Sequence, residues 1–277
     1  MTVHELTPAA RRPRRGARAG RELALLALLY LGYSAARLLG DADLAGATAH
    51  AEALLRVEAA LHLDVETWAN RALHGVPALA VAASYWYAAL HYLVTPAVLI
   101  WAYRSAPGRY RYVRNALVVG SAVGLVGFTV LPMAPPRMLP GYTDTLAATA
   151  DSGWWGSEAS APEGLGALTN QLAAMPSLHV GWAIWCAWVV LLLTRHRAAR
   201  VLAVAYAVGT TLVVVATANH YVLDAVAGAA VIALGIWVAI TRERATAEHS
   251  RVHHAGSPHT AAAGVGRRPD CCGARAA

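Results

Sequence analysis

The sequence contains no lysine and has few charged residues of either sign. All 23 basic residues of the 277 are arginine, 16 are acidic, and the charged fraction is 14% against 57% hydrophobic. Soluble domains carry about 25% charged residues, so the deficit excludes an ordinary soluble domain and indicates a membrane protein. Cysteine is scarce too. Cys186 falls within an apolar run, where it packs, and Cys271 and Cys272 lie in the polar C-terminal segment, so no disulfide framework is expected.

Apolar runs are what the sequence has in abundance. Crossing a bilayer takes about 17–25 residues, and six runs reach that length: 22–39, 77–103, 112–131, 178–195, 199–217 and 221–241. We therefore predict an all-α, polytopic membrane protein with a six-helix membrane domain over 21–244. Residues 1–20 and 245–277 are polar and without periodicity, and they are predicted to be disordered tails.

A cleaved signal peptide over 1–51 is the alternative for the N-terminal segment. It would combine the basic start, the first apolar run and the Ala49-His50-Ala51 triplet. The triplet lies too far beyond the apolar run for normal cleavage. An uncleaved first span is therefore the prediction.

The arginines alternate from one side of the expected membrane to the other. They precede the first run, separate the second from the third and the fourth from the fifth, and follow the sixth, whereas loops 40–76 and 132–177 are acidic. This positive-inside pattern predicts a multi-pass plasma-membrane protein with both termini in the cytoplasm. Although the net charge is +7, its distribution gives no reason to expect a nucleic-acid partner. The oligomeric state is not readable from the sequence.

Two segments outside the spans carry further pattern. Residues 50–74 interleave apolar residues with Glu52, Arg56, Glu58 and Glu66, which predicts a helix at the outer interface with Trp68 as its aromatic anchor. Loop 132–177 is long and rich in Pro, Gly and Trp, so it is expected to be an ordered lid or site loop.

The expected topology brings five polar residues to one membrane depth on the extracytoplasmic side. The third span ends just before Arg137, the fourth begins at Ser177 and His179, and the sixth begins at His220 and Asp224. Scattered residues would fall on both sides. Two histidines and a carboxylate at helix ends are the groups needed to move a phosphoryl group through a phosphohistidine.

Each candidate has a chemical role. Neutral His220 can attack phosphorus, and Asp224, one helical turn later, can hold its other ring nitrogen. His179 can protonate the leaving oxygen and then deprotonate the acceptor. Arg137, the only arginine in its loop, can bind phosphate oxygens in a bidentate way.

The remaining predicted substrate-binding residues are Ser177, which caps the fourth helix or hydrogen-bonds the phosphate, and Asn170. No metal and no cofactor are expected.

Structural roles remain open for the same residues. Ser177 starts a helix, His179 could be a core histidine, His220 and Asp224 could form a structural pair, and Arg137 could extend to the interface. His91, in the middle of the second span, is predicted to be a packed, hydrogen-bonded histidine, and the aromatic residues 85–87 are predicted to pack between helices.

Two motifs resemble a known family. Pro-Ser-Leu-His at 176–179 and His-Tyr-Val-Leu-Asp at 220–224 resemble the second and third signatures, Pro-Ser-x-His and His-x-x-x-Asp, of the PAP2 (type 2 phosphatidic acid phosphatase) superfamily. With Leu178 after the serine, Tyr221 after the histidine and Pro-Pro-Arg at 135–137, the chain is similar to the inositolphosphotransferase branch, the relatives of inositol phosphorylceramide synthase. The resemblance covers about 112–241. It implies a six-helix bundle and metal-independent chemistry with His220 as nucleophile, Asp224 as its partner and His179 as general acid and base.

Three positions depart from the signatures of the superfamily. The first signature, Lys, six residues, then Arg-Pro, is Val130 and Arg137-Met138 here, and the Arg expected six residues before His220 is Val214. Arg137 is therefore the main candidate cation. The departures put ordinary phosphatase activity in doubt and favour the transferase-like branch.

The predicted function is that of a lipid phosphotransferase or phosphatase acting at the extracytoplasmic face on a phospholipid or polyprenyl phosphate. A transporter is one alternative, but apart from His91 and Asp224 the spans carry almost no charge. A non-catalytic membrane scaffold with a degenerate site is the other, and the missing Lys and Arg keep it open.

Overall fold

The computed structural model describes residues 43–155 and 170–255, together with residues 20, 22–24, 27–28 and 31–32. The described residues are mostly helical and contain no named β-strand, and an isolated β-bridge joins Met133 to Ala173. The all-α class is therefore confirmed. Most of the predicted first span, residues 1–19 of the predicted N-terminal tail, Cys271 and Cys272 lie outside the described residues.

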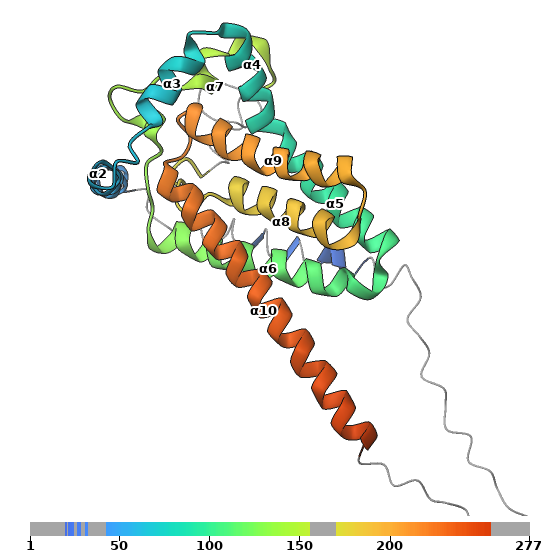
Figure 1. Cartoon of the computed structure of the whole chain (residues 1–277). Coiled ribbons are helices and arrows are strands. Elements are labelled where there is room, and N and C mark those ends of the chain that lie inside the picture. Colours follow the sequence, from blue (N-terminus) through green and yellow to red (C-terminus); the bar gives the residue numbers. More distant parts are fainter. Residues whose placement is uncertain are drawn as a thin grey trace, which may run out of the picture. The chain divides into compact units, whose positions relative to one another are not determined.

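Most of the helices follow one another with short connections, but a long segment that contains only short helical turns separates α6 from α8 (Figure 1). The α-helices are α2 (Leu44–Ala60), α3 (Glu66–His74), α4 (Pro77–Tyr85), α5 (His91–Ser105), α6 (Pro107–Val130), α7 (Thr145–Ala148), α8 (Leu178–Leu193), α9 (Arg197–Ala216) and α10 (Val222–Ala255). A π-helical turn, η1 (Trp86–Leu90), joins α4 to α5, and two 3-10 turns, η2 (Pro136–Met138) and η3 (Ala150–Ser152), lie in the loop after α6.

Three of the described helices are long and apolar enough to cross a membrane, which indicates a membrane protein. They are Pro107–Val130, Arg197–Ala216 and the Val222–Ala245 part of α10. The fourth predicted span is the shorter apolar helix α8, with 16 residues. The second predicted span is helical from Pro77 to Ser105, and a π-helical turn, η1, lies between α4 and α5.

Two predicted boundaries differ from the structure. Residues 50–74 do not form one helix, because α2 ends at Ala60 and α3 begins at Glu66, with His62 between them at a φ of 58°. At the other end, α10 continues to Ala255, so the predicted tail boundary at 245 falls inside a helix. Residues 1–240 and 241–277 form separate compact units, and the candidate site lies in the first.

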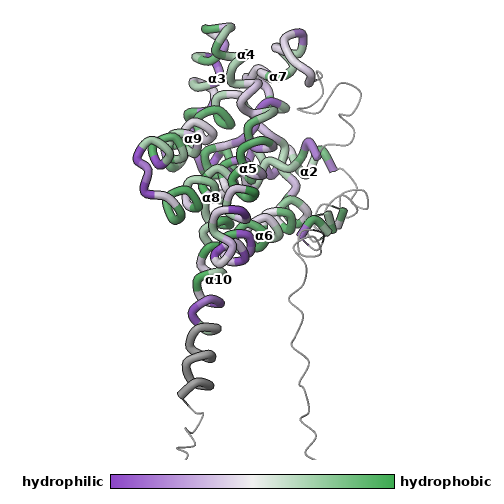
Figure 2. Tube along the Cα trace, turned by 90° about the vertical axis from the view of Figure 1, so that its right-hand side faces the viewer, coloured by the Kyte–Doolittle hydropathy of each residue, from purple (hydrophilic) through white to green (hydrophobic). Residues whose placement is uncertain are grey.

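Helix α8 packs against α5, α6 and α9 (Figure 1). The core around it contains Trp185, Val113 and Ile232, and Cys186 is buried there, as expected of a packing residue. The indole N–H of Trp185 donates to the carbonyl of Val113 at 2.8 Å, which joins α8 to α6. Hydrophobic residues run along α8 and α9 (Figure 2).

Close backbone contacts fix where α10 crosses its neighbours. A Cβ on Gly228 would lie 2.1 Å from the carbonyl oxygen of Ser177, and one on Gly235 would lie 2.3 Å from that of Ala116. Only glycine allows backbones to approach so closely. As a result, the start of α10 is held directly against the start of α8, where the candidate residues lie.

Candidate active site

The turn between α9 and α10 presents His220 in a fixed backbone conformation. Ala218 has a φ of 57°, a left-handed conformation that residues other than glycine adopt infrequently. The amides of Asn219 and His220 both donate to the carbonyl of Val214 at 3.1 Å, and this closes the end of α9. His220 is 4% exposed.

The His220 ring is oriented through its Nδ1 atom. Nδ1 lies 2.8 Å from the carbonyl oxygen of Ala174 and 3.4 Å from Oδ2 of Asp224. A carbonyl oxygen only accepts hydrogen bonds, so Nδ1 carries the proton. Nε2 is buried and has no hydrogen-bond partner, which leaves its lone pair available.

Asp224 connects the two signature segments. The carboxylate is fully buried, and Oδ2 also accepts the N–H of Tyr221 at 3.0 Å. The backbone carbonyl of Asp224 accepts the N–H of Ser177 at 2.9 Å. The aspartate therefore contacts the His220 ring through its side chain and the start of α8 through its main chain.

The second histidine faces the first across a short gap. The His179 ring lies in the first turn of α8, with its centroid 5.6 Å from that of His220. It stacks on Tyr87 with centroids 4.4 Å apart, and Nε2 of His179 is buried without a partner. Two imidazole nitrogens without partners thus belong to neighbouring rings.

Ser177 has a capping role. It is the N-cap of α8, fully buried, and its hydroxyl accepts the N–H of Val180 at 3.4 Å. Of the two roles expected from the sequence, the helix cap is the one present in the structure.

Arg137 is held beside the α9–α10 turn. Its Nε donates to Oδ1 of Asn219 at 3.1 Å, and its main-chain N–H donates to the carbonyl of Ala218 at 2.8 Å. Asp144 Oδ2 lies 3.7 Å from the same Nε. The guanidinium is therefore positioned by the residue that directly precedes His220.

Asn170 is not joined to this cluster by any interaction of the described residues. Its Oδ1 accepts the N–H of Leu172 at 3.1 Å, which organises its own loop. Residues 156–169, the other part of that loop, lie outside the described residues.

Two residues of the second predicted span, Tyr87 and His91, lie against the ring of His179, although the sequence analysis assigned both to packing. Tyr87 lies in the π-helical turn and stacks on His179, and the His91 ring is 4.3 Å from the ring of His179. His91 is hydrogen-bonded as predicted, with Nδ1 3.0 Å from the carbonyl of Tyr87. The only sequence signal was a histidine in an otherwise apolar run, and the π-helical turn was not foreseeable.

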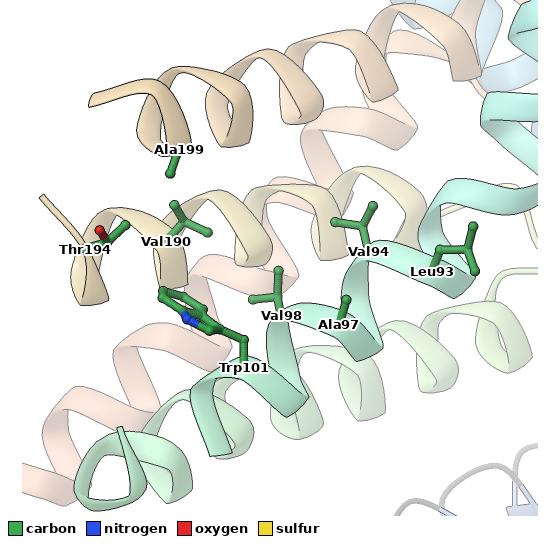
Figure 3. A pocket seen from close by; sticks show the side chains of 8 residues that line it. All are labelled: Leu93, Val94, Ala97, Val98, Trp101, Val190, Thr194 and Ala199. Carbon is green, nitrogen blue, oxygen red and sulfur yellow. The ribbon is translucent and has the colours of Figure 1, made fainter. Parts of the chain in front are cut away.

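A separate apolar pocket lies between α5, α8 and the start of α9 (Figure 3). Its volume is about 600 Å³, and its lining includes Leu93, Val98, Trp101 and Val190. None of the lining side chains is titratable. The pocket therefore supplies no acid, base or nucleophile from its lining.

The helices and the cluster together define an all-helical membrane protein with a buried histidine–aspartate pair facing a second histidine. Comparison with protein families gives one match: the PAP2 superfamily, over residues 52–238. The chain belongs to the PAP2 superfamily, and membership indicates a phosphatase- or phosphotransferase-type enzyme. Comparisons with curated proteins and with solved structures gave no significant match.

Proposed function

We propose that this protein is an integral-membrane lipid phosphotransferase or phosphatase that works through a phosphohistidine on His220. The observation that carries the proposal is the pair of free ring nitrogens. Nε2 of His220 and Nε2 of His179 are buried without partners, on rings 5.6 Å apart. One can attack phosphorus while the other transfers a proton.

In the first step, Nε2 of His220 attacks the phosphorus atom of the lipid phosphoester, and the bond from phosphorus to the leaving oxygen breaks. The leaving oxygen takes a proton from His179, which enters this step as the imidazolium. Asp224, 3.4 Å from Nδ1, stabilises the positive charge that develops on the His220 ring.

In the second step, an acceptor attacks the phosphohistidine. His179 removes the proton of the incoming hydroxyl, the new phosphorus–oxygen bond forms, and the bond to Nε2 breaks, which restores both rings to their initial states. If the acceptor is water, the enzyme is a phosphatase. If it is a lipid alcohol, the enzyme is a phosphotransferase.

Arg137 and the first turn of α8 are the proposed phosphate-binding groups. A guanidinium binds two phosphate oxygens at once, and the N-terminus of a helix carries the positive end of its dipole. Ser177 supports this turn through its cap, and Asn219 supports Arg137. Asn170 remains a proposed contact to the substrate from the loop.

We further propose six spans, with the site on the extracytoplasmic side and both termini in the cytoplasm. The site residues lie at the end of α6, the start of α8 and the α9–α10 turn. The arginines around the start of α6, around the connection between α8 and α9, and in α10 after residue 240 lie away from these ends of the helices. Positive residues mark the cytoplasmic side.

Assignment to the inositolphosphotransferase branch is supported by residues particular to that signature. The hydroxyl of Tyr221 is fully buried and donates to the carbonyl of Ala134 at 2.9 Å, next to Pro135. Leu178 fills the space beside Gly124 of α6. Both side chains therefore have a defined structural role.

The test uses purified protein in detergent with phosphatidylinositol, phosphatidate or a prenyl diphosphate as donor, with and without a lipid alcohol. Free phosphate, the phosphomonoester that hydrolysis of the diester donor would release, and the product formed on the acceptor are measured separately. We expect His220→Asn to abolish all three products. The matched control is His196→Asn, between α8 and α9, where the asparagine oxygen can still accept the N–H of Ala199 in place of Nδ1.

Each result has a distinct meaning. Acceptor product that requires His220 establishes a phosphotransferase, and hydrolysis products alone establish a phosphatase. If His220→Asn is as active as the wild type, or if no donor reacts, the proposed function is refuted.

A further inference from the structure

Two glutamates outside the signature motifs are buried where the sequence predicted an interfacial helix. Glu58, in the last turn of α2, and Glu66, the first residue of α3, are both 0% exposed. Burying a carboxyl group is costly unless its oxygens find partners. The helical period contained a signal for Glu58, which lies on the same face of α2 as the buried residues Ala47 and Ala51.

Both glutamates accept hydrogen bonds from the first turn of α10. Oε1 of Glu58 accepts the N–H of Leu223 at 2.6 Å, and Oε1 of Glu66 accepts the N–H of Val222 at 2.9 Å. These amides belong to the first turn of the helix, where no intrahelical acceptor exists. Negative charge is also favoured there by the helix dipole. α2 and α3 thereby hold the end of the helix that carries Asp224.

The second oxygen of each carboxyl group requires a shared proton. Oε2 of Glu58 and Oε2 of Glu66 are buried without a hydrogen-bond partner, and the other oxygens of the two carboxyl groups are held by consecutive amides of α10, those of Leu223 and Val222. Two ionised carboxylates in contact repel, whereas one proton between them satisfies both oxygens. The other titratable groups that face the pair are Asp224, Tyr142 and Tyr221.

The electrostatic surroundings favour the protonated pair. Burial, followed by the charge of Glu66 and that of Asp224, raises the pKa of Glu58 from 4.5 to about 8, against the opposing effect of the Leu223 amide. The proton is therefore retained at neutral pH.

We propose that Glu58 and Glu66 are positioning residues that share one proton and clamp the N-terminus of α10, which aims His220 and Asp224. The inference rests on the proposed function, because the residues being aimed are its nucleophile and the partner of that nucleophile. The glutamates contact neither His220 nor substrate, and they act through the backbone of Val222 and Leu223.

Glutamine substitutions test whether holding α10 depends on the shared proton or on the presence of two carboxylates. In Glu58→Gln the amide oxygen still accepts from Leu223, and the amide N–H replaces the shared proton by donating to Glu66. In Glu66→Gln the amide oxygen still accepts from Val222, and the amide N–H donates to Glu58. In the double variant two NH₂ groups face each other without an acceptor, so one buried donor loses its partner. The exposed Glu52→Gln, on the same helix, is the matched control.

We expect each single variant to retain the wild-type kcat, whereas in the double variant the unsatisfied donor displaces the start of α10 and with it His220, so that kcat falls by up to about 100-fold. Loss of the shared proton lowers the wild-type kcat as pH rises through about 8, and Glu58→Gln removes this component, whereas a decline caused by deprotonation of His179 is common to both proteins. Single variants as damaged as the double variant, or an unchanged alkaline decline in Glu58→Gln, overturn the inference.

A second readout does not require turnover, so it separates this inference from the proposed function. Because the raised pKa makes the folded state bind more protons than the unfolded state, wild-type stability decreases as pH rises from about 4.5 to about 8. Above about pH 8 the contribution of Glu58 to stability no longer changes with pH. The thermal midpoint of Glu58→Gln in detergent lacks this decrease, while Glu52→Gln keeps it. If the thermal midpoint of Glu58→Gln decreases as much as that of the wild type over this pH range, the shared proton is refuted. This result does not depend on whether any donor reacts in the activity assay.

Discussion

Substituting Gly228 by alanine tests whether the contact between α10 and α8 sets the catalytic geometry. A Cβ at this position would lie 2.1 Å from the carbonyl oxygen of Ser177 and 3.0 Å from its carbonyl carbon. The obstacle is backbone, so no side chain can rotate away. The start of α8 must move from α10 by about 1 Å to restore an ordinary contact, and a misplacement of that size can cost about 100-fold in rate.

The displacement acts directly on the two histidines. His179 follows Ser177 by two residues, and the N–H of Ser177 donates to the carbonyl of Asp224 at 2.9 Å. Moving Ser177 lengthens this hydrogen bond and separates the His179 ring from the His220 ring. We therefore expect Gly228→Ala to lower kcat by about 100-fold. Helix propensity cannot account for such a loss, because alanine favours a helix over glycine by about 1 kcal/mol.

The assay compares initial rates of wild type, Gly228→Ala and Gly108→Ala at saturating donor, each confirmed as monodisperse by size-exclusion chromatography. Gly108, in the first turn of α6, has nothing within 4 Å of the added Cβ and serves as the matched control. A wild-type kcat in Gly228→Ala would refute the reasoning. An equal loss in Gly108→Ala would show that the effect is not specific to the contact between α8 and α10.

Two further predictions concern Asn219, which hydrogen-bonds Arg137, and His91, whose ring lies beside that of His179. Asn219→Ala removes the oxygen 3.1 Å from Nε of Arg137, and we expect KM for the donor to rise about tenfold with kcat unchanged. Initial rates over a range of donor concentrations check this, and a fall in kcat at constant KM would contradict it. His91→Ala removes the ring 4.3 Å from that of His179, and we expect the opposite result: kcat lowered about tenfold at unchanged KM, because the general acid is less well aligned. A wild-type kcat would assign His91 to packing alone.

The sequence predicted those parts of the molecule that follow from local pattern. The predicted runs 112–131, 178–195 and 199–217 match α6, α8 and α9 to within a few residues, because long apolar segments must satisfy their backbone groups as helices. The capping role of Ser177 was also foreseeable, since serine before an apolar helix is a common N-cap.

The remaining parts depend on contacts between segments distant in the chain. Nδ1 of His220 contacts the carbonyl of Ala174, and no pattern in the sequence predicts a partner that consists of backbone. The burial of Glu58 and Glu66 was missed because glutamates are rarely fully buried. Their partners are amides of α10, and only the tertiary structure brings these amides to α2 and α3.

The departures from the family signatures are explained by where those positions lie. Val214, six residues before His220, is 1% exposed and packs with Val180, so an arginine there would place an unpaired charge in the core. Val130, where the family has lysine, is 75% exposed. Arg137 therefore remains the arginine held beside His220. One guanidinium matches the single negative charge of a phosphodiester better than the higher charge of a phosphate monoester. The proposed function therefore predicts a phosphodiester lipid as the preferred donor.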